Sequence, residues 1–146
     1  PDEDEERRIY GLHLAGGSPE QALAQVAPAT DAAGVLALQA AVARVLVDAA
    51  VLAYVARLVR RTRGYPGLHL GASPRAGVAV LATARALAAM RGRSFVVPDD
   101  VADAFLPCLR HRVALAPEAE VEGRSADDLL RELLKSEPVP RGVAAG

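Results

Sequence analysis

The chain has 146 residues, of which 51% are apolar and only 3% aromatic, and its 17 basic and 18 acidic residues leave a net charge of −1. A chain of this length can bury a sizeable core in one domain, and a core with few aromatic side chains must be built from Ala, Val and Leu, which favours closely packed helices. The balanced charge gives no reason to expect a nucleic acid or an anionic membrane as a partner.

The N-terminal third of the chain predicts three short helices separated by turns. Residues 2–14 begin with a run of acidic residues followed by two arginines, an order that suits a helix dipole. In residues 18–26, Ser18 can cap a helix that has Pro19 at its first position. Residues 31–45 carry apolar side chains at spacings of three and four, which is the helical period.

The two best-marked helices follow. Asp48 can cap a helix over residues 49–63, whose apolar positions form one stripe. Ser73 and Pro74 then open an alanine-rich helix that Gly92 ends as a C-terminal cap. The many alanines of this helix permit a close neighbour, and we expect Val78, Leu81, Ala84 and Ala88 on its buried face.

The last part of the chain is less regular. Pro98 starts a helix that Pro107 must kink or stop, because proline removes a backbone donor and its ring clashes with the preceding turn. Residues 113–124 show no regular pattern. Ser125 and Asp128 then form a weaker version of the capping box ahead of a leucine-rich helix.

Together these elements predict the fold class. We expect an all-α bundle of about six or seven helices, without a period-2 run long enough to build a sheet. Three parts are expected: a helix over residues 1–14, a helical domain over residues 15–136 and a flexible tail over residues 137–146.

The sequence also bears on where the protein works. No run approaches the roughly 18 uncharged apolar residues of a membrane span, and the first residues, "PDEDEERRIY", are acidic where a secretory signal is basic. The single cysteine, Cys108, cannot form an internal disulfide. We expect a cytoplasmic protein without a membrane segment and, since no initiating methionine is present, a fragment of a longer one.

The chain contains no recognisable catalytic machinery of its own. No Gly-rich loop ends in Lys-Ser or Lys-Thr, no histidines are paired at metal-binding spacing, and no Ser-His-Asp or Cys-His arrangement occurs. The three histidines, His13, His69 and His111, are scattered, so we expect packing or surface roles for them and no metal site.

Residues 68–77, "LHLGASPRAG", place Arg75 where a helix dipole disfavours a cation. With Ser73 as N-cap and Pro74 at the first helical position, Arg75 comes second, among unsatisfied backbone amides. A bound anion would explain the arginine, because such amides bind phosphates and a guanidinium adds a planar fork of donors. The alternative is that Arg75 points into solvent or pairs with a carboxylate such as Asp99.

Two glycines favour the anion site over this alternative. Gly71 allows a turn that other residues resist, and Gly77 removes a side chain from the first helical turns. Another backbone or a ligand can therefore approach closely. The sequence predicts a phosphate contact around Arg75.

Other charged clusters have simpler interpretations. Four arginines within residues 57–63 complement the C-terminal end of a helix dipole, although they could also meet phosphates or an acidic partner. Asp99 and Asp100 stand at a helix start, where they are better interpreted as caps and dipole partners than as metal ligands.

A longer stretch resembles a known family. Residues 70–115, "LGASPRAGVAVLATARALAAMRGRSFVVPDDVADAFLPCLRHRVAL", closely resemble the C-terminal helical lid of MoxR-type AAA+ ATPases. The resemblance extends upstream through "YVARLVRRTRGYPGLHLG" and downstream through "PEAEVEG" and "ADDLLRELLKSEPVPR", with residues 15–47 matching more loosely. "PDEDEERRI" resembles the segment just after the nucleotide-binding core. One departure is Val97, where relatives often carry a Thr that can cap the helix.

The resemblance implies a role for the residues around Arg75. The arginine of the "GASPRA" stretch is the sensor-2 residue of that family, which reaches from the lid to the terminal phosphate of ATP, so Arg75 takes this role by resemblance. Gly71, Ser73 and Pro74 would form the ATP-facing stretch with it. ATP and Mg²⁺ would be held mainly by an upstream core, whose Walker A, Walker B, sensor-1 and arginine-finger residues match nothing here. The chain alone should therefore bind no nucleotide and hydrolyse no ATP.

The resemblance also implies partners. Members of the family form rings, usually hexamers, so the lid would contact its own core and that of a neighbouring subunit. They act as chaperone-like remodellers that help mature or insert metal cofactors in partner proteins, often alongside a von Willebrand factor A domain protein.

Two alternatives stay open at this point. One is a self-contained helical module that binds protein or nucleic acid through Arg75 and the arginines of residues 57–63. The other is the lid of a magnesium-chelatase-like ATPase, which shares the general layout. The sequence motifs "SPRA" and "LRHRV" favour the MoxR type.

Overall fold

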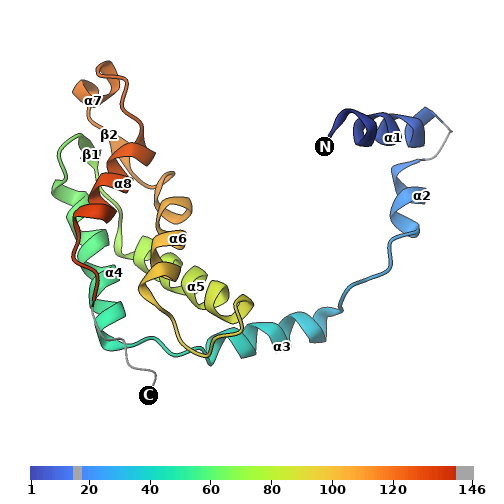
Figure 1. The fold of residues 1–146 in the computed structure, drawn as a ribbon, viewed down its shortest axis with the longest axis horizontal. Helices are drawn as coiled ribbons and strands as arrows, with labels where there is room; N and C mark the ends of the chain where they lie inside the picture. Colours follow the sequence, from blue (N-terminus) through green and yellow to red (C-terminus); the bar gives the residue numbers. More distant parts are fainter. Residues whose placement is uncertain (15–17, 141–146) are drawn as a thin grey trace. The chain divides into compact units, whose positions relative to one another are not determined.

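The computed structural model describes residues 1–14 and 18–140, which form two compact units that divide between Ala37 and Leu38. Helices dominate both units (Figure 1), so the predicted helical fold class is confirmed. The first unit spans residues 1–37, and the second begins at Leu38.

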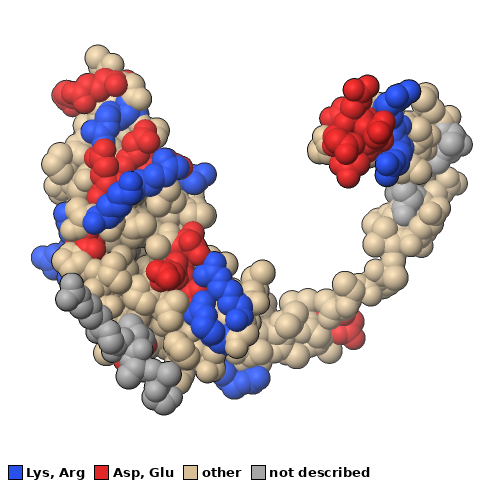
Figure 2. All heavy atoms as spheres, in the orientation of Figure 1, with Lys and Arg blue, Asp and Glu red and all other residues tan. Residues whose placement is uncertain are grey.

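The first unit consists of helices without a core of their own. It holds α1 (Glu3–Leu14), α2 (Pro19–Ala24) and the first half of α3 (Ala32–Ala43). Reciprocal hydrogen bonds join Ser18 and Gln21 at the predicted start of α2. Acidic side chains gather on α1 (Figure 2). No residue described in this unit is buried, so its helices lack apolar packing within the unit.

The second unit contains the end of α3 and all remaining elements. The predicted caps Asp48 and Gly92 are confirmed: the Asp48 side chain accepts from the Ala50 N–H, and Gly92 has a φ of 71°. The elements in chain order are α4 (Ala49–Arg61), the 3₁₀ turn η1 (Thr62–Gly64), β1 (Leu68–Leu70), α5 (Pro74–Met90), α6 (Pro98–Leu109), β2 (Ala114–Leu115), α7 (Pro117–Val121) and α8 (Ala126–Ser136).

Helix α5 lies between α4 and α6 at the centre of this unit (Figure 1). Its fully buried positions recur every four residues, at Ala76, Val80, Ala84 and Ala88. Small side chains at this spacing let both neighbouring helices approach closely. Larger side chains from the surrounding helices complete the core: Tyr54, Leu58, Phe105, Leu109, Leu130 and Leu133. Each fully buried leucine contributes about 1.5–3 kcal/mol to the free energy of unfolding.

The predicted buried face of α5 was wrong in part. Ala84 and Ala88 are buried, but Val78 is 67% exposed and Leu81 only half-buried. Both the predicted and the observed face satisfy helical spacing, so periodicity alone could not choose between them. The α5 face with the smaller side chains meets the core because it permits closer packing.

A short two-stranded ribbon was not predicted. Strands β1 and β2 pair antiparallel, with Leu68 opposite Leu115 and Leu70 opposite Ala114. Residues 113–124 are therefore more regular than expected, since they contain both β2 and α7. Strands of two or three residues are too short to show a period-2 pattern in the sequence.

Pro107, expected to kink or stop its helix, does not stop it. Helix α6 continues past Pro107 and ends at Leu109. Because Pro107 lies in the last turn, the ring removes only one bond near the helix end, to the carbonyl of Asp103. Leu109 is fully buried, and its packing favours continuation of the helix.

A buried carboxylate joins α5 to α6. Asp100 is completely buried, and both of its oxygens accept from the Arg93 guanidinium at 2.6 Å. Arg91 Nη1 donates to Asp100 Oδ1 at 2.7 Å, and the Val97 N–H donates to Oδ2 at 3.0 Å. Asp100 thus satisfies the Val97 N–H, while the Asp100 N–H donates to the Val97 carbonyl at 3.0 Å in place of a side-chain cap. Burial raises the pKa of Asp100, but these hydrogen bonds more than offset it, so the pKa lies below its ordinary value.

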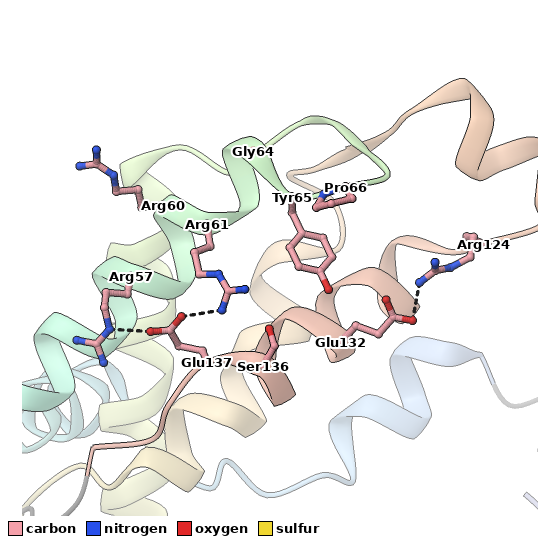
Figure 3. Close-up of a pocket in the computed structure, with 10 residues that line it drawn as sticks. All are labelled: Arg57, Arg60, Arg61, Gly64, Tyr65, Pro66, Arg124, Glu132, Ser136 and Glu137. Carbon is pink, nitrogen blue, oxygen red and sulfur yellow. Dashed lines mark hydrogen bonds and ion pairs between the residues drawn. The ribbon is translucent and has the colours of Figure 1, made fainter.

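A second carboxylate fastens the end of α8 to α4. Glu137 follows the last residue of α8, and only 5% of its side chain is exposed. Arg57 Nε donates to Oε1 at 2.7 Å and Arg61 Nη1 donates to Oε2 at 2.8 Å (Figure 3). The sequence assigned Glu137 to a flexible tail, but its carboxylate is anchored in the fold. Residues 141–146 of the predicted tail lie outside the described residues.

The Asp100 contacts predict a large difference between two adjacent aspartates. Asp100→Asn should lower the free energy of unfolding by about 2–3 kcal/mol, because it removes the charge that holds both arginines. Asp99→Asn is the matched control: Asp99 is exposed, and its loss should cost within about 0.5 kcal/mol. Urea unfolding of both variants measures the difference. Equal effects would contradict a stabilising role for the buried carboxylate.

The Glu137 ion pairs predict a pH-dependent stability. Burial raises the pKa of Glu137, but hydrogen bonds from Arg57 and Arg61 lower it by more than burial raises it. The pKa therefore lies below its ordinary value of 4.5. A lowered pKa in the folded state stabilises the fold above pH 4.5, and this stabilisation is lost as the pH falls through the folded-state pKa.

Glu137→Gln should therefore destabilise the chain by about 1–2 kcal/mol at pH 7, less than a fully buried pair because both arginines are partly exposed. The difference from the unmodified chain should shrink below pH 4.5. Thermal unfolding of both proteins from pH 3 to pH 7 tests this, and a difference independent of pH would contradict it.

Candidate functional site

The segment before α5 is fastened to the end of α4. The Ala72 N–H donates to Thr62 Oγ1 at 2.8 Å, and Arg63 Nε donates to the Ala72 carbonyl at 3.0 Å. Thr62 is fully buried, and its hydroxyl donates in turn to the Val59 carbonyl at 2.7 Å. Both backbone groups of Ala72 are thus held by the adjoining turn, which fixes where α5 begins.

Gly71 is required for this fastening for a reason that differs from the predicted one. Its φ is not in the left-handed region; in the described chain that region is occupied by Gly67, Gly92 and Gly123. A Cβ at Gly71 would instead overlap the backbone of Thr62 and Arg63. The close approach expected at Gly71 therefore involves the chain's own η1 turn.

Arg75 occupies the first turn of α5, as predicted. Ser73 is the N-cap residue, with φ −78° and ψ 164°, and Pro74 is the first helical residue. Ser73, Pro74 and Arg75 are exposed, whereas Ala76 is fully buried and anchors the turn in the core. The Ser73 side chain makes no capping hydrogen bond; instead the Ala76 N–H donates to the Ser73 carbonyl at 2.9 Å.

The Arg75 guanidinium is available to an external group. Among the residues that the structure describes, no carboxylate lies within ion-pair distance of it, so the alternative pairing with Asp99 is not formed. Ala72 and Ala76 thus hold the backbone on either side of Arg75 in place, while the Arg75 side chain stays exposed. This arrangement can present hydrogen-bond donors to an anion that approaches the start of α5.

An apolar groove begins beside this helix start. A hollow of about 280 Å³ lies between α4 and α5, lined by Pro74, Gly77, Val78 and Leu81 on one side and by Leu52, Val55 and Val59 on the other. A Cβ at Gly77 would meet Val59 and Val55 only at ordinary contact distances of 3.6 and 3.8 Å. Gly77 therefore leaves space in this groove without being forced by close packing.

The four arginines of residues 57–63 do not form a simple basic patch. Arg57 and Arg61 are paired with Glu137, and Arg63 donates to the Ala72 carbonyl. A cleft of about 740 Å³ lies beside them, and it also contains the Arg124–Glu132 ion pair (Figure 3). Two of the four arginines thus share one carboxylate and a third is bound to a backbone carbonyl, which weakens the interpretation as a nucleic-acid-binding surface.

The histidines show no sign of a metal site. His69 and His111 are exposed, and His111 Nε2 accepts from Arg112 Nε at 3.0 Å. The His13 side chain lies outside the described residues. Within the described ranges, no three His, Cys, Asp or Glu side chains are grouped so that they could hold a metal ion. No described helix has the length and apolar character needed to cross a membrane.

The positioning of α5 predicts opposite outcomes for two glycines. Gly71→Ala should lower the free energy of unfolding by about 1–3 kcal/mol, because the new methyl group would force the η1 turn away. Gly77→Ala should be neutral or stabilise the chain by up to about 1 kcal/mol, because alanine is the better helix former and has room. Urea unfolding distinguishes the two, and equal tolerance would contradict the fastening of the segment.

Comparison with known proteins agrees with this geometry. Residues 60–133 match the AAA lid domain family, a match that covers half of the chain. Chaperone MoxR1 of Mycobacterium tuberculosis is 34% identical over 97% of the chain, and the uncharacterized protein YeaC of Bacillus subtilis is 37% identical over 70% of it. The chain spans only 38% and 32% of the lengths of these two relatives.

Structural comparison gives the same result. The crystal structure of a candidate ATPase from Cytophaga hutchinsonii matches 73% of the chain with a TM-score of 0.70 and 28% sequence identity, and the match spans 35% of that protein. Protein MoxR of Methylorubrum extorquens is 35% identical over 48% of the chain. The chain therefore belongs to the AAA lid domain family, as a lid of the MoxR type.

Proposed function

We propose that this lid serves an ATP-binding core in the same polypeptide, and that Arg75 is its sensor-2 residue. The observation that carries the proposal is the placement of Arg75 at the start of α5, exposed and without a carboxylate partner in the described part of the chain. A cation that destabilises its own helix start is best explained by an external anion. In an AAA lid, that anion is the terminal phosphate of ATP.

The donors around Arg75 fit a phosphate. The Ser73 hydroxyl makes no capping bond, and the Arg75 guanidinium adds a charged fork beside it. Gly71 would act indirectly, by letting Ala72 hold the segment against η1. ATP with Mg²⁺ would supply the bond to be hydrolysed and would be held mainly by the core.

The proposed mechanism follows from the rigidity of α5. Arg75 would donate to the terminal phosphate when the lid closes and would lose this contact after hydrolysis. Because Ala76 at the next position is buried between helices, a force on Arg75 acts on the whole helical unit. The contact would also stabilise the charge that develops during phosphoryl transfer. The sequence of this chain contains no phosphate-binding Gly-rich loop, so we propose that it does not hydrolyse ATP alone.

The proposed partners extend beyond the core of the same polypeptide. We propose a hexameric cytoplasmic ring in which the lid also contacts the neighbouring core, and a chaperone-like role in remodelling or metal-cofactor maturation of partner proteins. A von Willebrand factor A domain protein is a further proposed partner. The name of Chaperone MoxR1 supports the chaperone role by similarity. The Glu137 pairing of Arg57 and Arg61 argues against the alternative of a free nucleic-acid-binding module.

Substitution of Arg75 in the full-length protein tests the sensor-2 role. Arg75→Ala should lower kcat for ATP hydrolysis by about 10- to 1,000-fold, the upper value being the low end of what an arginine finger contributes. Arg75→Lys should restore only part of the rate, because lysine lacks the planar fork of donors. Arg44→Ala is the control, since Arg44 is exposed and lies outside the start of α5.

A stability measurement separates this role from a structural one. Arg75→Ala removes a cation from the positive end of a helix dipole, so the free energy of unfolding should rise by about 0.3–1 kcal/mol while kcat falls. An unchanged ATPase rate, together with unchanged nucleotide-dependent assembly, would contradict the proposal.

A further inference from the structure

Thr62 ties the segment before α5 to the end of α4, although it lies 10 positions before Ala72 in the chain. Its side chain is fully buried, and its one oxygen accepts from the Ala72 N–H at 2.8 Å and donates to the Val59 carbonyl at 2.7 Å. Among uncharged side chains of this size, only a hydroxyl donates and accepts at a single atom. Both hydrogen bonds therefore depend on a hydroxyl at this position.

The backbone that carries Arg75 is held on both sides. On one side Ala72 is fully buried, and only Ser73 and Pro74 separate it from Arg75. The Pro74 ring fixes its own φ, which leaves this short connection little freedom. On the other side Ala76 is fully buried among the helices. The position of Ala72 therefore decides the point from which the Arg75 side chain extends.

Two side chains hold Ala72, and they are not equivalent. Arg63 Nε donates to the Ala72 carbonyl at 3.0 Å, but Arg63 is exposed, so water competes for its guanidinium and its long side chain can adjust. The hydrogen bond from the Ala72 N–H to Thr62 lies in the interior, where a donor without an acceptor is costly. Thr62 is therefore the stricter of the two constraints on Ala72.

We propose that Thr62 is a positioning residue for ATP hydrolysis, because its hydroxyl fixes the point from which Arg75 reaches the terminal phosphate. The inference rests on the proposed function of Arg75. Thr62 is fully buried, so it acts through Arg75 and not by contact with the nucleotide. A displacement of about 1 Å at a contacting group can lower a rate by about 100-fold, so a remote hydroxyl can matter for the reaction.

Two conservative substitutions in the full-length protein test the hydroxyl. Thr62→Val keeps the branched shape and removes the hydroxyl, so it should lower kcat for ATP hydrolysis by about 3- to 100-fold, the upper value being the cost of a displacement of about 1 Å. Thr62→Ser keeps the hydroxyl and should restore most of the rate. An unchanged kcat in Thr62→Val, or an equal loss in both variants, would overturn the proposal.

A double-mutant cycle with Arg75→Ala separates positioning from a general loss of stability. If Thr62 acts through Arg75, Thr62→Val should leave kcat unchanged once Arg75 has been replaced. A general defect would lower kcat by the same factor in both backgrounds, and that result would overturn the proposal.

Leu133→Ala is the matched control for stability. Leu133 is fully buried on α8 and takes no part in holding Ala72. At a temperature where both variants stay folded, Leu133→Ala should keep the unmodified kcat while Thr62→Val lowers it. Equal losses in the two variants would show that weakened packing alone lowers the rate, and they would overturn the role given to the hydroxyl.

Amide hydrogen exchange in the 146-residue chain tests the anchor without nucleotide. Thr62→Val should speed exchange of the Ala72 amide several-fold relative to that of Ala84, which is buried in the middle of α5 and reports opening of the whole helix. Thr62→Ser should keep the Ala72 amide protected. Exchange that rises equally at Ala72 and Ala84 would show that the hydroxyl stabilises the unit without fixing Ala72, and it would overturn the proposal.

The two proposals fail in distinguishable ways. An unchanged ATPase rate in Arg75→Ala removes the sensor-2 role and the positioning role with it. A lowered rate in Arg75→Ala, combined with an unchanged rate in Thr62→Val, keeps the sensor-2 role and removes only the positioning role of Thr62.

Discussion

The hydrogen bond from the Ala72 N–H to Thr62 Oγ1 decides where the central helix of the lid begins. It joins the end of α4 to the segment before α5, and the absent side chain of Gly71 makes the required backbone approach possible. The start of α5 in turn sets which stripe enters the core and which stripe faces the groove. The exposed position of Arg75 thus depends on a contact between two small residues that carry no charge.

Local features of this fold were predictable from the sequence because their partners lie within one turn. The box formed by Ser125 and Asp128 is present, with the Asp128 N–H donating to Ser125 Oγ at 3.2 Å and the Ser125 N–H donating to Asp128 Oδ2 at 3.1 Å. The caps at Asp48 and Gly92 belong to the same class. The ion pairs of Glu137 with Arg57 and Arg61 could not be predicted, because they join residues 80 and 76 positions apart.

The same distinction between local and distant partners applies to the candidate site. Sequence reasoning located Arg75 and its neighbours because a cation at a helix start breaks a local rule. It missed Thr62, whose hydroxyl has a role only once β1 has brought the chain back to α4. For Gly71, sequence reasoning gave the wrong reason, because a glycine needed for close backbone approach and one needed for a turn look alike in sequence.

The pairing of Glu137 also bears on where this lid can be cut for study. A chain ending at Ser136 would keep every helix of the second unit, yet it would leave the guanidiniums of Arg57 and Arg61 without their acceptor. The new terminal carboxylate at Ser136 would replace the charge of Glu137 but not its side chain, whose two oxygens each accept from one of these guanidiniums. Affinity for polyanions measured on such a piece would therefore include a contribution from two guanidiniums that the longer chain keeps paired.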